Sequence, residues 1–324
     1  MTTAGTIVPR GALARLGLLG NRFGIYAVLL ALLVFPAFWL SEYRNIGNLG
    51  IIFQQSAALA ILAVGQTFVI ACGMIDLSVG QLMGLVVVLG CSFMQGSADA
   101  TVPAILLALV IGLGVGAVTG FLNNRLRIHS LILTFGMLSV LQGTIFVYTD
   151  RSVGGASPAV LRIANGAVMG IPIAVPLVLV IALLAALLLH CTRFGLHVRA
   201  VGANEEGARR AGIDVARVKL PVFIVSGLSA AIAGIILAGR LGTGYPNAGT
   251  GFELDAIVAV VLGGTPLSGG RGTILGSVAA VIVLGVTANL LNLLGMSAFI
   301  QMVVKGAIVI AAVLINQPRA MARA

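Results

Sequence analysis

The sequence predicts an all-α fold, a single polytopic membrane domain (1–324) with about ten transmembrane helices. Of the 324 residues, 59% are hydrophobic and 9% charged, and the mean hydropathy is +1.13. A soluble domain is about half apolar and about a quarter charged. The chain also holds about ten apolar stretches near the ~20 residues that a helix needs to span a bilayer. Its 43 glycines suit closely packed membrane helices.

The first predicted span covers 24–41, after a basic segment, 1–23, that we place in the cytoplasm. The charge there resembles a signal peptide, but the apolar run is long and lacks an A-x-A cleavage site, so we expect it to remain uncleaved. The other predicted spans are 50–71, 77–96, 102–122, 130–148, 172–191, 219–240, 253–268, 273–294 and 298–316. The polar segment 149–171, rich in Gly and Pro, is predicted to be an extracytoplasmic loop.

The basic residues predict the orientation of the chain. With the N-terminus inside, 14 of the 19 fall on the inner side. They are Arg10, Arg15, Arg22, Arg125, Arg127, Arg193, Arg199, Arg209, Arg210, Arg217, Lys219, Arg271, Arg319 and Arg323. Only Arg44, Arg151, Arg162 and Arg240 fall outside, and Lys305 lies within the last span. Since Lys and Arg concentrate in cytoplasmic loops, both termini are predicted to be cytoplasmic.

Several function classes are excluded by what the sequence lacks. No D-x-x-D or H-E-x-x-H motif occurs, and the three cysteines have neither disulfide nor metal spacing. The run 263-GGTPLSGGRGT-273 lacks the G-K-[ST] ending of a phosphate loop. The net charge of +10 is spread over connectors and forms no patch with aromatic residues, which argues against nucleic acid. We therefore expect no catalytic, cofactor or metal site in this chain.

Two stripes of small residues predict close helix packing within one chain. Gly112, Gly116 and Gly120 recur every four residues on one face. A second stripe with the same spacing consists of Ser226, Ala230, Gly234 and Ala238. Small residues at this spacing let two helix backbones approach each other.

The stretch 72-CGMIDLSVGQ-81 places a charge and two glycines within an apolar region. Asp76 at hydrocarbon depth costs about 2.5–3.5 kcal/mol. Irregular backbone at that depth occurs only where it is buried in protein or lines a cavity. We therefore predict that Gly73, Asp76, Ser78 and Gly80 belong to a translocation pathway. A purely structural role for Asp76, as the N-cap of the next helix, is an equal alternative, and the two roles can coexist.

The segment 73-GMIDLSVG-80 has a weak echo 190 residues later, in 263-GGTPLSGG-270. Glycine-interrupted apolar segments in two halves of a chain indicate a transport site, so Gly263, Ser268 and Gly270 are added to the predicted pathway. The two copies have the same orientation in our span count. Either the internal repeat is accidental, or one short segment (63–75 or 253–265) is re-entrant.

The loop 199–215 is predicted to contain a two-turn cytoplasmic helix. Asn204 can cap its start, acidic residues occupy its first turn, and Gly212 can end it. A helix this short needs packing to be stable, and its exposed end can bind another protein. The alternative is a structured connector. The predicted docking residues are Gly202, Asn204, Glu205, Glu206, Arg209 and Gly212.

Lys305 is predicted to lie in mid-span, one helical turn after Gln301. An ammonium group at that depth needs a carboxylate or a wet cavity. Asp255 and Asp76 are the candidate partners, and we favour an intramembrane ion pair with Asp255. The alternative is a lysine that faces a polar crevice without a specific partner.

Four stretches resemble a known family. They are 65-GQTFVIACGMIDLSVG-80, 202-GANEEGARRAGI-213, 249-GTGFELDAIVAVVLGGTPLSGGRGTILG-276 and 301-QMVVKGAIVIAAVL-314. The chain looks like the permease subunit of bacterial ATP-binding-cassette (ABC) importers for monosaccharides of the ribose, xylose and arabinose type. It departs from the family at Pro266 and at 72-CG-73, so the preferred substrate need not follow that of the best-studied members.

The resemblance implies a permease of the bacterial inner membrane that imports a monosaccharide or related polyol and is not itself an enzyme. It implies a second permease copy in a homodimer, a cytoplasmic ABC ATPase that holds ATP and magnesium, and a periplasmic sugar-binding protein. The segment from Asn204 to Gly212 would then be the coupling helix that docks on the ATPase. The rival class is a secondary transporter driven by an ion gradient, for which only Asp76 and Asp255 are available as membrane acids.

Overall fold

The computed structural model describes residues 45–297, 299–304 and 306–307, together with Leu30, Val34 and Tyr43. Its helices are α2 (Ile46–Ala71), α3 (Val79–Met94), α4 (Thr101–Leu126), α5 (Ser130–Tyr148), α6 (Pro158–Asn165), α7 (Ala174–Cys191), α8 (Arg193–Ala203), α9 (Glu205–Arg210), α10 (Val215–Leu241), α11 (Phe252–Leu262) and α12 (Ile274–Leu293). A short antiparallel hairpin joins β1 (Ala167–Val168) to β2 (Ile171–Pro172).

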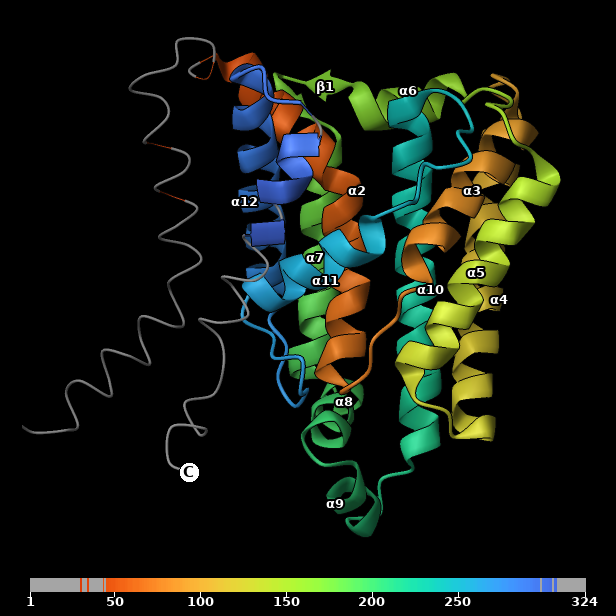
Figure 1. Ribbon diagram of the computed structural model, residues 1–324, viewed down its shortest axis with the longest axis vertical. Helices are drawn as coiled ribbons and strands as arrows, with labels where there is room; N and C mark the ends of the chain where they lie inside the picture. Colours follow the sequence, from red (N-terminus) through yellow and green to blue (C-terminus); the bar gives the residue numbers. More distant parts are fainter. Residues whose placement is uncertain are drawn as a thin grey trace, which may run out of the picture.

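Helix α10 stands between two groups of helices (Figure 1). On one side of it lie α2, α7, α11 and α12, and on the other lie α3, α4 and α5. Helix α10 packs against α2, α3 and α4, so it joins the two groups into one body. Helices α8 and α9 lie at one end of the molecule, and α6 and the hairpin lie at the other (Figure 1). These ends are called the α9 end and the α6 end below.

Six of the predicted spans are confirmed as long apolar helices. In the described part of the chain, α2, α4, α5, α7, α10 and α12 are long and apolar enough to cross a membrane. The chain is therefore a multi-pass membrane protein. The predicted count of ten spans is not confirmed, because α3 has 16 residues and α11 only 11. Most of the first predicted span, 24–41, and more than half of the last, 298–316, fall outside the described residues.

The two short helices each follow a non-helical segment. Residues 72–78 run from the α9 end of α2 to the start of α3, and residues 242–251 run from the α6 end of α10 to α11 (Figure 1). Each of these two interrupted segments therefore combines a non-helical stretch with a helix shorter than a full span, and the first stretch is largely extended whereas the second consists mainly of turns. Of the two re-entrant alternatives, 63–75 continues α2 as far as Ala71, whereas 253–265 contains the short α11.

The first small-residue stripe packs α4 against α10 within one chain, as predicted. A Cβ atom on Gly112 would lie 2.5 Å from the carbonyl oxygen of Gly227, and one on Gly116 would lie 2.5 Å from that of Phe223. Those distances leave no room for a side chain. In the second stripe, Gly234 packs instead against Val86 of α3. A Cβ atom on Gly234 would lie 2.7 Å from Cγ1 of Val86.

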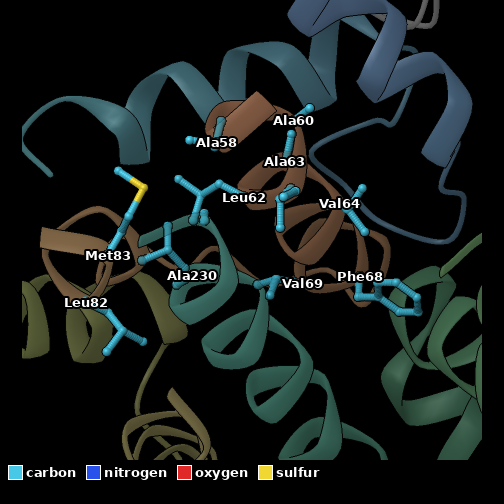
Figure 2. Packing of buried hydrophobic residues seen from close by; sticks show 14 of the residues in the cluster. Ala58, Ala60, Leu62, Ala63, Val64, Phe68, Val69, Leu82, Met83 and Ala230 are labelled. Atoms are coloured by element: carbon cyan, nitrogen blue, oxygen red, sulfur yellow. The ribbon is translucent and has the colours of Figure 1, made fainter. Parts of the chain in front are cut away.

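The apolar core lies where α2, α3 and α10 meet. Figure 2 shows Leu62 of α2 near Met83 of α3 and Ala230 of α10. On another face of α2, Phe68 points away from this junction (Figure 2) and stacks on Phe194 of α8, with 6.3 Å between the ring centroids. All of these side chains except Phe194 are fully buried or nearly so. Helix α2 is therefore held from several sides, which fixes the position of the segment that follows it.

Candidate functional site

The two short helices, α3 and α11, begin next to each other inside the molecule. A Cβ atom on Gly80, at the start of α3, would lie 2.0 Å from Oε2 of Glu253 and 2.8 Å from the carbonyl oxygen of Gly249. A Cβ on Gly249, just before α11, would lie 1.9 Å from the carbonyl oxygen of Gly80. Only glycine permits this backbone approach. Two helix N-termini, each a positive end of a backbone dipole, therefore lie close to two buried acids, Asp76 and Glu253.

Asp76 is buried and fully hydrogen-bonded. Its Oδ1 atom accepts from the backbone N–H of Ser78 at 2.9 Å and from the Ser78 hydroxyl at 2.6 Å. Its Oδ2 atom accepts from the hydroxyl of Ser226 on α10 at 2.9 Å. The prediction that Asp76 is the N-cap residue is wrong, because Ser78 holds that position and its side chain makes no capping bond. Asp76 lies two residues earlier and instead binds the backbone N–H of Ser78 itself. The bond to Ser226 in addition ties the start of α3 to the central helix.

Two hydroxyls of α5 bind the extended backbone in the middle of 72–78. The hydroxyl of Ser130 accepts from the N–H of Ile75 at 3.1 Å, and that of Thr134 accepts from the N–H of Leu77 at 3.0 Å. Thr134 also donates to the carbonyl of Ile75 at 3.2 Å. Unpaired peptide groups in a membrane cost several kcal/mol each, so these two hydroxyls, one helical turn apart on α5, stabilise the interruption.

Glu253 is less well satisfied than Asp76. Its side chain is buried in the first turn of α11, and Oε1 accepts from the N–H of Gly251 at 3.2 Å. Its Oε2 atom, the one that faces Gly80, finds no hydrogen-bond partner within the residues the structure describes. The neighbouring Gln81 donates to the hydroxyl of Thr250 at 3.4 Å. The second interrupted segment therefore carries an incompletely paired carboxylate at its helix start.

The glycine-rich breaks meet at the end of α8. A Cβ on Gly202 would lie 2.0 Å from the carbonyl oxygen of Ala71 and 2.8 Å from the N atom of Gly270. A Cβ on Gly269 would lie 2.8 Å from the carbonyl oxygen of Gly202 and from the Cα of Gly73. The N–H of Gly270 also donates to Ala71 at 3.0 Å. Segments 72–78 and 263–273 thus touch each other and α8 at one point.

The predicted pathway residues fall in three places. Asp76, Ser78 and Gly80 lie at the buried start of α3, whereas Gly73, Ser268 and Gly270 lie at the α8 junction. Gly263 lies where α11 packs on α12, with its Cβ position 2.4 Å from the carbonyl carbon of Gly276. The two segments of the predicted repeat are neighbours but not structural equivalents. Residues 73–80 lead into the short helix α3, whereas 263–270 follow the short helix α11.

The predicted two-turn helix is confirmed as α9. The side chain of Asn204 caps it by accepting from the N–H of Gly207 at 2.8 Å, and Gly212 has a φ of +84° beyond its end. Two i,i+4 ion pairs run along it, Glu205–Arg209 at 3.1 Å and Glu206–Arg210 at 3.2 Å. The predicted loop 199–215 differs in one respect, because residues up to Ala203 belong to α8. Gly202 is therefore packed against the breaks and is not on the exposed face of α9.

One further ion pair fixes α9 to α10. Lys219 Nζ lies 2.8 Å from Glu205 Oε2, and the lysine side chain is only 17% exposed. The hydrogen bond from Lys219 lowers the pKa of Glu205 below its ordinary value of 4.5, with help from the nearby charges of Lys219 and Arg209. Sequence reasoning missed this pair because the two residues are 14 positions apart.

A polar cleft of about 730 Å³ opens beside α9. It is lined by the start of the first interruption (Cys72, Gly73), by the turn between α4 and α5, and by Glu205 and Lys219. His129 lies in that turn. The same cleft is therefore lined both by residues of α9 and by the start of the chain that leads to Asp76.

Lys305 falls outside the described residues, so its pairing with Asp255 or Asp76 remains a prediction. Asp255 lies in the first turn of α11, close to Glu253 in the chain. Across the described ranges, no group of three or more His, Cys, Asp or Glu is placed to hold a metal ion.

Residues 48–313 match a protein family described as "Branched-chain amino acid transport system / permease component". The chain is 40% identical over 296 residues to the ribose import permease protein of Escherichia coli (strain K12), covering 90% of this chain and 92% of the relative. It is 39% identical over 305 residues to the ribose import permease protein of Bacillus subtilis (strain 168), covering 93% of each.

It is also 33% identical over 329 residues to the L-arabinose transport system permease protein of Escherichia coli (strain K12), covering 98% of this chain and 96% of the relative. No solved structure matches the chain.

Proposed function

Because this chain belongs to the family of transport-system permease components, we propose that it is the membrane-spanning subunit of an ABC importer for a monosaccharide or a related polyol. The observation that carries the proposal is the similarity to ribose and arabinose permeases over at least 90% of the chain. A transport subunit needs no catalytic centre of its own. In this proposal, ATP and magnesium bind to a separate cytoplasmic ATPase, and a periplasmic binding protein delivers the sugar.

The exposed face of α9 is the proposed docking site for the ATPase. Its two ion pairs and its cap make it a formed helix, and Lys219 holds it against α10. The cleft beside it has the volume and polarity to receive a segment of that partner. In this proposal α9 lies in the cytoplasm, and the distribution of basic residues supports this position and a cytoplasmic position of both chain termini.

The contact at Gly202 supplies a route from the ATPase to the membrane interior. Helix α8 connects directly to α9 through Asn204, and its last residues touch both glycine-rich breaks. A displacement of α9 is therefore passed to 72–78 and 263–273 together. We infer that these breaks flank the translocation pathway, with Asp76 and Ser78 holding the start of α3 while the extended chain moves.

A second copy of the permease is the proposed neighbour of α5. This apolar helix exposes Gly136, Ser139, Gly143 and Thr144 on its outer surface. Apart from the backbone of α5 itself and the adjacent residues, no described atom lies within 4 Å of a Cβ built on Gly136 or Gly143. Small and hydroxyl-bearing residues suit a contact between helices better than a contact with lipid tails. A homodimer through α5 would also place the hydroxyls that bind the first interruption next to the shared interface.

Reconstitution tests the proposed function. The permease, its ATPase and its binding protein are placed in proteoliposomes, and uptake of radiolabelled ribose, arabinose and other monosaccharides is measured with ATP on the α9 side. Uptake of at least one of these sugars should need all three proteins and ATP. Uptake driven by a proton or sodium gradient without the ATPase would instead establish the secondary-transporter class, and stoichiometric ATP binding by the permease alone would contradict the assignment.

A further inference from the structure

The hairpin between α6 and α7 has an apolar, exposed tip. Met169 is 99% exposed, and Val168 and Ile171 are 55% and 58% exposed. This is the reverse of what a water-facing turn normally presents, since Gly, Asn, Asp and Ser dominate such turns. The tip lies at the α6 end of the molecule, far from α9 (Figure 1).

The backbone of the tip makes the choice of methionine more unusual. Met169 has a φ of +53° and Gly170 a φ of +79°, as in a two-residue type I′ turn. Asn or Gly is preferred at the first of these positions, and a bulkier residue there costs about 1–3 kcal/mol. The chain thus accepts backbone strain to hold an apolar side chain at the most exposed point of the hairpin.

The depth of the tip follows from the length of α7. This helix has 18 residues, which span about 27 Å, whereas the hydrocarbon core is about 30 Å thick. Arg193 follows directly at its α9 end and marks the aqueous boundary there. The opposite edge of the hydrocarbon therefore lies beyond Ala174, at the level of Ile171 and its neighbours.

The tip is also continuous with the apolar outer surface of α7. Strand β2 packs against α7, and the Cγ atom of Pro172 on that strand lies 3.6 Å from the position that a Cβ would take on Gly50, near the start of α2. Leu179 and Leu183 continue the exposed apolar surface further along α7, at 58% and 59% exposure. We propose that Val168, Met169 and Ile171 insert into the acyl-chain edge of the bilayer leaflet at the α6 end, where they anchor the hairpin and complete the membrane-spanning length of α7.

Depth-dependent fluorescence quenching tests this proposal. The chain has a single tryptophan, Trp39, so a Trp39→Phe background carries one new probe at a time. Met169→Trp keeps a bulky residue at the turn, which already accommodates methionine. Leu183→Trp serves as the control for the lipid-facing surface, and Ser152→Trp, in the exposed loop at the same end, serves as the aqueous control. Each full-length variant is reconstituted in phosphatidylcholine vesicles.

Lipids brominated near the headgroup end of the acyl chain should quench Trp at position 169 more than lipids brominated near the methyl end. Aqueous iodide should quench it about threefold less than it quenches Trp at position 152. Iodide quenching equal to that at position 152 would overturn the proposal, because the tip would then lie in water. This holds even if adding a binding protein abolished the quenching. Protection from both iodide and bromine would overturn it as well, since a protein surface would then cover the tip.

Discussion

Each of the two interrupted segments has a buried carboxylate near the start of a short helix, but the two carboxylates differ in their hydrogen bonds. Asp76 accepts three hydrogen bonds that use both of its oxygens. Oε1 of Glu253 accepts a hydrogen bond from the N–H of Gly251, and its Oε2 has no partner within the described part of the chain. A buried polar atom without a partner costs about 1–3 kcal/mol. In the first segment both carboxylate oxygens of Asp76 are hydrogen-bonded. In the second, a partner for Oε2 of Glu253 would stabilise the structure further.

The largest expected effect comes from closing the contact between the two segments. Gly80→Val places branched carbons where Glu253 Oε2 and the Gly249 carbonyl already lie. Overpacking against backbone should destabilise the fold by about 3 kcal/mol, the upper end of its usual cost. We expect little monodisperse protein by size-exclusion chromatography after extraction. Gly90→Ala on the same helix is the control, because its added Cβ would meet only the end of Met94 at 3.8 Å. Normal recovery of the valine variant would contradict the contact.

Removing the first carboxylate should have the next largest effect. Asp76→Ala leaves Ser78 and Ser226 without their acceptor, so we expect a loss of about 2–3 kcal/mol in the free energy of unfolding. Asp76→Asn should lose only about 1 kcal/mol, since its carbonyl still accepts from Ser78 and the Ser226 hydroxyl can accept from the amide. Thermal unfolding in one detergent compares the two. Equal midpoints for both variants would show that the hydrogen bonds contribute nothing.

Glu253→Gln should change stability much less. The substitution removes a charge whose Oε2 lacks a partner among the residues described, while the amide oxygen can still accept from Gly251. We expect the free energy of unfolding to change by less than about 1 kcal/mol, and in the stabilising direction. The same thermal unfolding series measures it. A loss as large as that of Asp76→Ala would remove the distinction between the segments.

The smallest effect concerns the exposed carboxylate of α9. Hydrogen bonding from Lys219 lowers the pKa of Glu205, so its stabilising contribution is complete above its ordinary pKa of 4.5 and is lost as the pH falls through the lower folded value. Because Glu205 is partly exposed, this contribution stays below about 1 kcal/mol. The difference in unfolding midpoint between the parent and Glu205→Gln should therefore be present at neutral pH and vanish in acid. Glu206→Gln, which affects only the pair with Arg210 on the same helix, should show a smaller difference. A pH-independent difference for Glu205→Gln would contradict the pairing.

Local signals in the sequence were enough to predict α9 and the six long helices. Asn204 and Gly212 are cap and stop residues whose effect depends on their immediate neighbours. The shortness of α3 was not predicted, and that of α11 was only one of two open alternatives, because hydropathy does not distinguish an apolar helix from apolar non-helical chain. The bond between Asp76 and Ser226 joins residues 150 positions apart, and no local pattern indicates it.

The sequence indicates the roles of Ser130 and Thr134 more weakly than it indicates α9. Their spacing of four residues places two hydroxyls on one face of an otherwise apolar α5, and such a pair indicates a polar neighbour inside a membrane protein. Glu253 was visible as an acid beside Asp255, but its burial against Gly80 depends on the close approach of two backbones. That approach is a tertiary feature.

The most direct test of the account measures sugar transported per ATP hydrolysed by the reconstituted importer with Gly202→Ala. An added Cβ would press on the Ala71 carbonyl and on Gly270, where α8 meets both breaks. Because the added Cβ can also lower the yield of folded permease, the ratio is measured only on complexes that have assembled with the ATPase. In these complexes ATP should still be hydrolysed, because the face of α9 is unchanged, but the transport ratio should fall about tenfold. Gly207→Ala on α9, whose added Cβ would meet only the side chain of Asn204 at 3.1 Å, should keep the parental ratio. An unchanged ratio for Gly202→Ala would contradict the proposed route from the ATPase to the pathway.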